Sequence, residues 1–276
     1  MINNPALAAE LIHKSDALLI TAGAGIGVDS GLPDFRGNEG FWKAYPPIKR
    51  LGISFYEMAN PEWFQRDPKL AWAFYGHRLN LYRSTTPHHG FKRILLHAEQ
   101  KTHGYFIYTS NVDGQFQKAG FAADQIVECH GSIHYLQCST PCSDKTWAAD
   151  RTEITVDLDN FEAKDPLPLC PDCDSLARPN ILMFGDWFWV SNRTRKQEER
   201  FNHWIDWLNH KDSNLVIIEI GAGTAVPTVR RLSENLASQR NAKLIRINPR
   251  EYQVPGENIS IPESALNGIN QIFDYL

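Results

Sequence analysis

The chain has 276 residues, of which 42% are hydrophobic and 22% are charged, and its formal net charge is -4. This composition is that of an ordinary globular protein, and the length suits one large domain or one domain with an inserted lobe. The charge balance provides no general attraction to nucleic acid, so we expect no nucleic-acid partner. No apolar run is long enough to span a bilayer, and the first ten residues lack the pattern of a secretory signal, so we expect a cytoplasmic protein without a membrane partner.

The predicted elements alternate between helices and strands along the chain. Helical periodicity covers residues 5–15, 91–100 and 196–210, and the aromatic-rich residues 41–84 are expected to be helical and irregular. Short, continuous apolar runs predict strands buried on both faces at 17–21, 105–108, 126–128, 214–220 and 243–247. The composition changes over residues 132–180, which are rich in cysteine and proline, and this segment is interpreted as an inserted module.

The predicted strands end in glycine, asparagine, aspartate or histidine. In open parallel sheets, ligands bind beyond the carboxyl ends of the strands. Small and polar groups at five such ends therefore predict a cofactor site along that edge.

Four of the five cysteines form two close pairs. Such pairs in a reducing compartment favour a structural zinc site with four thiolate ligands over disulfides, although four unrelated cysteines are the alternative. The expected ligands are Cys138, Cys142, Cys170 and Cys173. The remaining thiol, Cys129, is interpreted as a buried residue.

These observations predict an α/β fold: a Rossmann-like parallel sheet with an inserted zinc-binding module and a small helical segment. The expected Rossmann-like cofactor-binding domain comprises residues 1–41, 85–131 and 181–276. The helical segment 42–84 and the zinc-ribbon module 132–180 are expected to form the small domain.

The first predicted strand leads into Gly23-Ala24-Gly25. Glycines at this position allow a tight turn and a close approach to a pyrophosphate. The dinucleotide motif is incomplete because its third glycine position holds Val28. On these residues alone, a turn without a ligand is an equal alternative.

The longer run from Gly23 to Gly37 resembles the cofactor loop of the sirtuin family of NAD-dependent protein deacylases, G-A-G-x-S-x-x-S-G-I-P-D-F-R. Gly27 departs from the family's serine. The resemblance implies that NAD is bound by Gly23, Ala24, Gly25, Asp34, Phe35 and Arg36. An arginine offers a forked donor to phosphate, and a phenylalanine offers an apolar lid.

Two further motifs carry the catalytic residues that the resemblance implies. Thr109-Ser-Asn-Val-Asp113 is similar to the family's T-Q-N-I-D, with Ser110 in place of glutamine, and implies that Ser110, Asn111 and Asp113 contact the cofactor. An Asx turn at the end of a strand is the alternative for this segment. The run from Glu128 to Ser132 resembles E-L-H-G-S, which implies that His130 is the general base. Any one of the ten histidines, taken alone, is more often structural.

The second half of the chain carries weaker likenesses. Residues 178–186 resemble R-P-x-V-V-x-F-G-E, which implies substrate-backbone binding by Met183, Phe184 and Gly185, while a buried strand is a compatible alternative. Gly221, Gly223 and Asn248 fall where the family binds phosphate and the adenine-side ribose.

The acyl preference is indicated by Tyr75 and Arg78. This Tyr-x-x-Arg pair resembles the pocket of class III sirtuins, and both side chains can donate to a distal carboxylate from one helix face. A helix with a buried tyrosine and a solvated arginine is the alternative.

The resemblance implies a protein lysine deacylase that removes acetyl groups, with succinyl and malonyl groups as further candidates. Its partner would be an acyl-lysine protein or peptide, and its products nicotinamide and O-acyl-ADP-ribose. The alternatives are a sirtuin-type ADP-ribosyltransferase, an NAD hydrolase and a catalytically silent NAD-binding module. The sequence does not indicate an oligomeric state.

Overall fold

The computed structural model describes residues 3–33, 37–240 and 242–276. Asp34, Phe35 and Arg36, which the cofactor-loop motif assigns to NAD binding, lie outside these residues. Within the described ranges, no helix has both the length and the apolar character needed to cross a membrane.

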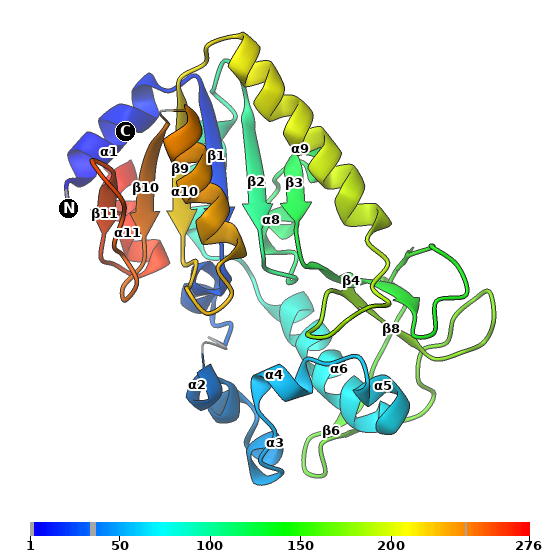
Figure 1. Cartoon of the computed structure of the whole chain (residues 1–276). Coiled ribbons are helices and arrows are strands. Elements are labelled where there is room, and N and C mark those ends of the chain that lie inside the picture. Colours follow the sequence, from blue (N-terminus) through cyan, green and yellow to red (C-terminus); the bar gives the residue numbers. More distant parts are fainter. Residues whose placement is uncertain (1–2, 34–36, 241) are drawn as a thin grey trace.

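A six-stranded parallel sheet forms the larger part of the molecule (Figure 1). Its strand order is β11-β10-β9-β1-β2-β3. The strands are β1 (Ala17–Ala22), β2 (Tyr105–Thr109), β3 (Ile126–Glu128), β9 (Leu215–Ile220), β10 (Lys243–Ile247) and β11 (Ile259–Ile261). The central strands are buried along their whole length, which explains why their sequences are continuous apolar runs.

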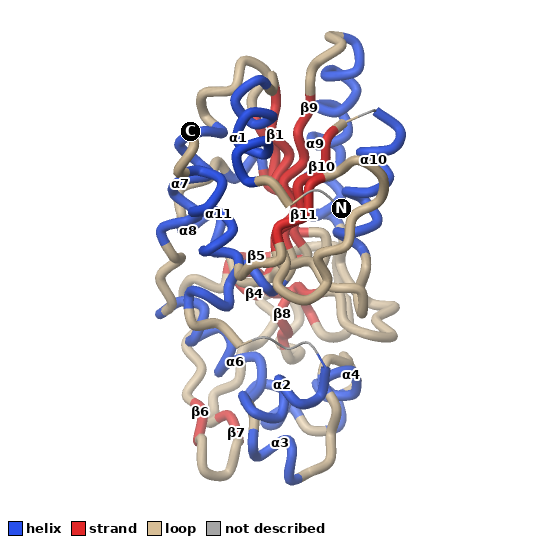
Figure 2. Tube along the Cα trace, turned by 90° about the vertical axis from the view of Figure 1, so that its left-hand side faces the viewer, coloured by secondary structure: helices blue, strands red, loops and turns tan. Residues whose placement is uncertain are grey.

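Helices cover both faces of this sheet (Figure 2). On one face lie α1 (Pro5–Lys14), α7 (His89–Ala98), α8 (Gln115–Lys118) and α11 (Ala265–Phe273), and on the other lie α9 (Asn192–His210) and α10 (Thr228–Arg240). The α/β prediction with a parallel sheet is therefore confirmed. The sequence analysis did not predict β11, α10 or α11.

The second lobe lies beyond the carboxyl edge of the sheet (Figure 1). Its helices are α2 (Gly37–Ala44), α3 (Pro46–Arg50), α4 (Phe55–Met58), α5 (Trp63–Arg66) and α6 (Pro68–Ser84). Its strands are β4 (Gly131–Cys138), β5 (Trp147–Ala148) and β8 (Ala177–Ile181) in one antiparallel sheet, and β6 (Val156–Asp157) and β7 (Glu162–Ala163) in a hairpin. A separate core rich in aromatic residues joins these helices and strands.

Candidate functional site

The order in which the chain adds strands to the sheet reverses between β1 and β9. From β1 it proceeds to β2 and β3 on one side, and then returns to β9, β10 and β11 on the other. Such a switch point opens a crevice beyond the carboxyl ends of the two strands, where ligands bind in open α/β sheets. Gly23 and Gly221 each follow one of these two strands.

The two loops at the switch point touch backbone to backbone. The N–H of Gly25 donates to the Gly221 carbonyl at 3.1 Å, and the N–H of Gly23 donates to the Ile220 carbonyl at 3.0 Å. A Cβ on Gly23 would lie 2.7 Å from the Ala222 Cα, and a Cβ on Gly221 would lie 2.5 Å from the Gly25 Cα. The expected helix after the turn is a 3₁₀ helix, η1 (Ala24–Ser30), and its first residue, Ala24, is exposed.

The end of β2 is tied to the end of β1. The Asn111 amide donates to the Gly23 carbonyl at 3.1 Å, and the Ser110 N–H donates to the Ala22 carbonyl at 3.1 Å. The Thr109 hydroxyl accepts from the Asn111 N–H at 3.0 Å. Asn111 therefore holds the glycine turn at the switch point in place.

Asp113 is a buried carboxyl group in this region. Its side chain is 8% exposed, and its Oδ1 accepts from the Gln115 N–H at 3.0 Å, which is the Asx turn left open by the sequence. Burial raises the pKa of Asp113 to about 6; the nearby Glu128 carboxylate adds to this rise, while the Gln115 N–H bond and the Arg78 charge oppose it. Keeping this carboxylate charged therefore costs free energy in the ligand-free protein. A hydrogen-bond donor on a ligand would reduce that cost.

His130 lies between β3 and β4, with Thr228 on one side and Leu182 on the other. Its Nε2 is 3.4 Å from the Thr228 hydroxyl, and its carbonyl accepts from the Leu182 N–H at 3.0 Å. Burial lowers the pKa of His130, and a hydrogen bond to the Ser110 backbone opposes this effect. The imidazole is therefore neutral at neutral pH, which is the form that accepts a proton. The sequence analysis did not identify Thr228.

Asn248 is completely buried and acts inside the protein. Its amide donates to the Ala222 carbonyl at 2.9 Å, and its Oδ1 accepts from the N–H groups of Arg250 and Glu251 at 3.1 and 2.9 Å. These bonds fix the loops after β9 and β10 beside each other. Gly223, in the loop after β9, is half-buried.

Tyr75 and Arg78 lie together inside the second lobe on α6. Arg78 is only 7% exposed, so the alternative of a solvated arginine is wrong. Its Nε and Nη2 donate to the Tyr82 hydroxyl at 3.0 and 2.9 Å, and its guanidinium faces the rings of Phe74 and Tyr75. The Tyr75 hydroxyl is buried and has no hydrogen-bond partner among the described residues. Buried hydroxyls are nearly always paired, so this group marks a place for an acceptor.

The segment after β8 connects His130 to the helices of the second lobe. Met183 is buried, and the Phe184 N–H donates to the Ala59 carbonyl at 2.9 Å. Gly185 is exposed with φ 68°, a left-handed conformation that favours glycine. The buried Asp186 carboxylate accepts two hydrogen bonds from Arg178, at 2.9 and 2.8 Å.

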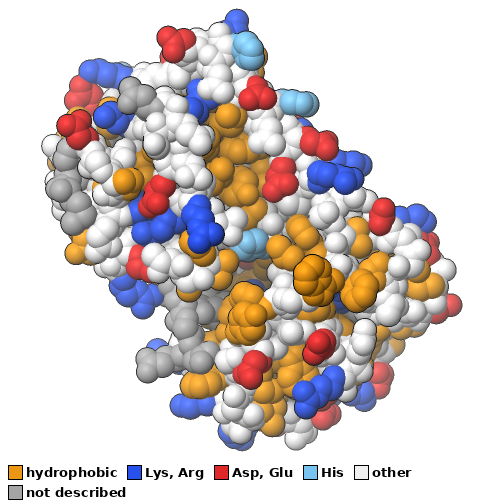
Figure 3. All heavy atoms as spheres, viewed as in Figure 1, with side chains coloured by type: hydrophobic (Ala, Val, Ile, Leu, Met, Phe, Trp, Pro, Cys, Tyr) orange, Lys and Arg blue, Asp and Glu red, His pale blue; other side chains and the backbone are white. Residues whose placement is uncertain are grey.

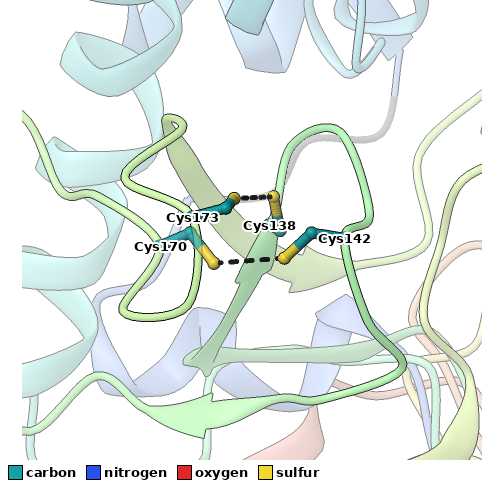
Figure 4. Close-up of side chains that lie close together, drawn as sticks. All are labelled: Cys138, Cys142, Cys170 and Cys173. Atoms are coloured by element: carbon teal, nitrogen blue, oxygen red, sulfur yellow. Dashed lines mark hydrogen bonds between the residues drawn. The ribbon is translucent and has the colours of Figure 1, made fainter.

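The four paired cysteines converge at one end of β4, where their sulfurs face one another (Figure 4). All four sulfurs lie within 4.8 Å of one another, with 3.7 Å between Cys138 and Cys173 and 3.6 Å between Cys142 and Cys170. Sulfurs at about 2.3 Å from a tetrahedral zinc ion are about 3.8 Å apart, so the geometry fits zinc. A closed set of four thiolates leaves no open position, which makes the site structural.

A cavity of about 470 Å³ adjoins Asp113 on the side of β4 and α8. Its wall includes His134, whose Nε2 lies 2.9 Å from the Asp113 carbonyl oxygen. A second cavity of about 600 Å³ lies among α3, α4, α5 and α6, and its described lining includes none of the residues predicted for the site.

Comparison with known proteins identifies the family. The family model described as Sir2 family matches residues 23–221. An NAD-dependent protein deacylase of Aquifex aeolicus (strain VF5) is 29% identical over 260 residues, which cover 94% of this chain and 95% of that protein. Another, of Leptospira interrogans serogroup Icterohaemorrhagiae serovar copenhageni (strain Fiocruz L1-130), is 30% identical over 237 residues, covering 86% and 82%. The crystal structure of a Sir2 homologue in complex with NAD matches with a TM-score of 0.73 at 25% identity, covering 98% of this chain and 92% of that one. The resemblance found in the sequence is confirmed, and the chain belongs to the Sir2 family.

Proposed function

We propose that this protein is an NAD-dependent protein lysine deacylase that produces nicotinamide and O-acyl-ADP-ribose. The observation that carries the proposal is the position of Asn111, which is bonded to Gly23 at the switch point; the residue before it, Ser110, is bonded through its backbone to His130, and the buried Asp113 follows two residues later. The relatives named as NAD-dependent protein deacylases support it. The division into an NAD-binding domain and a small domain at the boundaries given above belongs to the same proposal.

The residues at the switch point would hold the cofactor. NAD, when bound, supplies the ADP-ribose that accepts the acyl group and releases nicotinamide. The backbone of Gly23, Ala24 and Gly25, together with Gly221 and Gly223, would hold the phosphates, and Ser110 would contact the ribose beside the nicotinamide. Asn248 acts by fixing the two loops on the adenine side rather than by direct contact, because its side chain is buried and bonded within the chain.

Asp113 would serve as a hydrogen-bond acceptor, and His130 as the general base. The carboxylate of Asp113 accepts from an amide N–H, which is favourable because a carboxylate is a strong acceptor in a buried site. His130, whose pKa burial lowers, takes a proton from a hydroxyl group as a neutral imidazole. Asn111 positions the glycine turn through its bond to the Gly23 carbonyl.

The substrate is an acyl-lysine protein or peptide. The backbone of Met183, Phe184 and Gly185 binds the substrate chain, and the acyl group extends toward Tyr75 and Arg78. Succinyl and malonyl groups match this pocket, because the unpaired Tyr75 hydroxyl and the Arg78 guanidinium can both donate to a carboxylate. Cys138, Cys142, Cys170 and Cys173 hold structural zinc, and four reduced thiolates suit the predicted cytoplasmic setting.

Mass spectrometry tests the reaction class. Purified protein is incubated with NAD and peptides that carry acetyl-, succinyl- or malonyl-lysine, beside the variants His130→Ala and His89→Ala. His89 is an exposed histidine outside the site and serves as the matched control. We expect loss of the acyl group with formation of the matching acyl-ADP-ribose in wild type and His89→Ala, and none in His130→Ala. ADP-ribosylated protein, or NAD consumption with intact peptides, would instead identify the transferase or the hydrolase, neither of which the comparisons favour.

A further inference from the structure

Large aromatic side chains are exposed beside the segment proposed to bind substrate. Trp187 is 92% exposed, Tyr56 is 63% exposed and Phe188 is 60% exposed. Tryptophan and phenylalanine are usually buried, and a group of them at the surface commonly marks a binding surface. Figure 3 shows hydrophobic side chains gathered on this face where the two lobes meet. We call Tyr56, Phe184, Trp187 and Phe188 the aromatic patch.

The turn that presents Trp187 is held rigidly from inside. Asp186 accepts two hydrogen bonds from the buried Arg178 and a third from the Phe188 N–H at 3.2 Å. On the other side of Trp187, the buried Gln137 donates to the Phe188 carbonyl at 2.8 Å. Trp187 is therefore exposed on a fixed backbone. A side chain presented in this way binds a partner with a small entropic cost.

The aromatic patch is continuous with the proposed substrate segment. The Leu182 N–H is bonded to the His130 carbonyl, so the segment begins beside the proposed base. Two residues further, the ring of Phe184 lies 4.3 Å from the ring of Tyr56. Four residues separate Leu182 from Trp187, and because the chain turns at Phe184-Gly185, the two lie closer together than an extended chain of that length would place them. A substrate bound along this segment thus brings residues close to its acyl-lysine within reach of Trp187.

The chemistry of the patch selects an uncharged occupant. The carboxylate of Asp186 is paired with Arg178 in the interior, so the turn contributes an apolar surface without a charge of its own. We infer that Trp187, supported by Phe188 and Tyr56, is a specificity-determining residue that selects acyl-lysine segments with an aromatic or large aliphatic residue within four positions of the acyl-lysine. This inference rests on the proposed function.

Steady-state kinetics on peptides tests the inference. Each peptide carries one acyl-lysine and differs only in a Trp, Leu, Ala, Glu or Lys placed at one flanking position. Wild type is compared with Trp187→Ala, Trp187→Phe and Tyr275→Ala, the last removing an exposed tyrosine near the chain end. We expect Trp or Leu at one position to lower KM about tenfold relative to Ala, with kcat little changed, since a buried aromatic anchor contributes at this level. Trp187→Ala abolishes the preference, while Trp187→Phe and Tyr275→Ala retain it.

Fluorescence anisotropy of the labelled acyl-peptides measures binding separately from turnover. If wild type deacylates the peptides but neither KM nor affinity depends on the neighbours, the inference is wrong while the proposed function stands. If no peptide is deacylated by wild type, the proposed function fails and takes the inference with it. Analytical ultracentrifugation tests whether a second copy of the chain binds the aromatic patch instead. If wild type is a dimer that Trp187→Ala dissociates, and peptide preference does not change, the patch is a dimer interface and the inference is wrong.

Discussion

The Asp113 carboxyl group illustrates how a functional residue opposes stability. Burial raises its pKa from 3.8 to about 6, and one pKa unit corresponds to about 1.4 kcal/mol, so the carboxylate costs the folded state at most about 3 kcal/mol at pH 7. Asp113→Asn keeps an oxygen for the Gln115 N–H and removes the charge. We expect the variant to be about 1–2 kcal/mol more stable, because the buried amide group still carries a desolvation cost that offsets part of the gain.

The sign of this effect depends on pH. Between about pH 4 and pH 6 the folded protein binds more protons than the unfolded chain, so the stability of wild type falls as the pH rises through this window. The advantage of Asp113→Asn is therefore complete above pH 6 and disappears below pH 4. Urea unfolding at pH 7.5 and pH 4.5 measures it, and deacylation should fall about tenfold or more with the lost charged acceptor. A variant less stable than wild type at pH 7.5 would contradict the argument.

The Tyr75 hydroxyl offers a test of acyl preference that leaves the fold intact. Because it is buried without a partner among the described residues, Tyr75→Phe should leave the free energy of unfolding unchanged or raise it by up to about 1 kcal/mol. We expect kcat/KM to fall about tenfold for succinyl- and malonyl-lysine peptides and to stay constant for acetyl-lysine. Tyr82→Phe is the matched control, since it removes the acceptor of Arg78 and should lower stability. Equal losses for all three acyl groups would refute an acidic-acyl pocket.

At the scale of elements, the contact between the loops after β1 and β9 depends on Gly221. Its φ is 63°, and an added Cβ would lie 2.5 Å from the Gly25 backbone. Gly256 has a similar φ of 58°, and among the described residues no atom beyond its two chain neighbours lies within 4 Å of an added Cβ. Gly256→Ala should therefore cost about 1 kcal/mol for the conformation alone, and Gly221→Ala about 2–4 kcal/mol with weakened NAD binding. Thermal unfolding and calorimetric NAD titration measure both, and equal costs would show that the loop contact contributes nothing.

Five of the six strands of the large sheet could be predicted, because each of them is a short apolar run that ends in a turn residue. The missed elements carried weaker signals. The strand β11 has only three residues, Ile259-Ser-Ile261. The helix α11 did carry an apolar stripe, with Ala265, Ile269, Ile272 and Phe273 buried. That spacing could have identified the helix.

The sequence proposes site residues by type but does not give their surroundings. Asn248 could be identified as a strand-end residue, but only the structure places it in the interior, bonded to three backbone groups. Thr228 contacts His130 although the two are 98 residues apart in the sequence. Tyr82 contacts Arg78 across one turn of the same helix. The exposure of Trp187 could not be predicted, because tryptophan in an apolar segment is usually buried.

At the scale of the whole molecule, the cysteine site lies in the second lobe, whose core is separate from the two hydrophobic clusters on the faces of the parallel sheet among the described residues. The sheet of β4, β5 and β8 packs in the core of the second lobe, whereas the parallel sheet packs on α1, α7, α9, α10 and α11. The chain passes from His130 directly into β4, which ends at Cys138. Loss of the metal should therefore reach the proposed active site through β4 while leaving the parallel sheet folded.

Zinc removal tests this coupling. Elemental analysis of the purified protein should give about one zinc per chain, and structural zinc in small modules contributes about 10 kcal/mol or more. After chelation, we expect hydrogen exchange to speed up over residues 131–181 before it changes in β1 and β9, with deacylation lost and restored by added zinc. Leu158→Ser is the control, since it alters an exposed residue of the same lobe away from the cysteines. Simultaneous loss of protection in both lobes would mean that the two lobes unfold as one unit and that the zinc stabilises the entire chain.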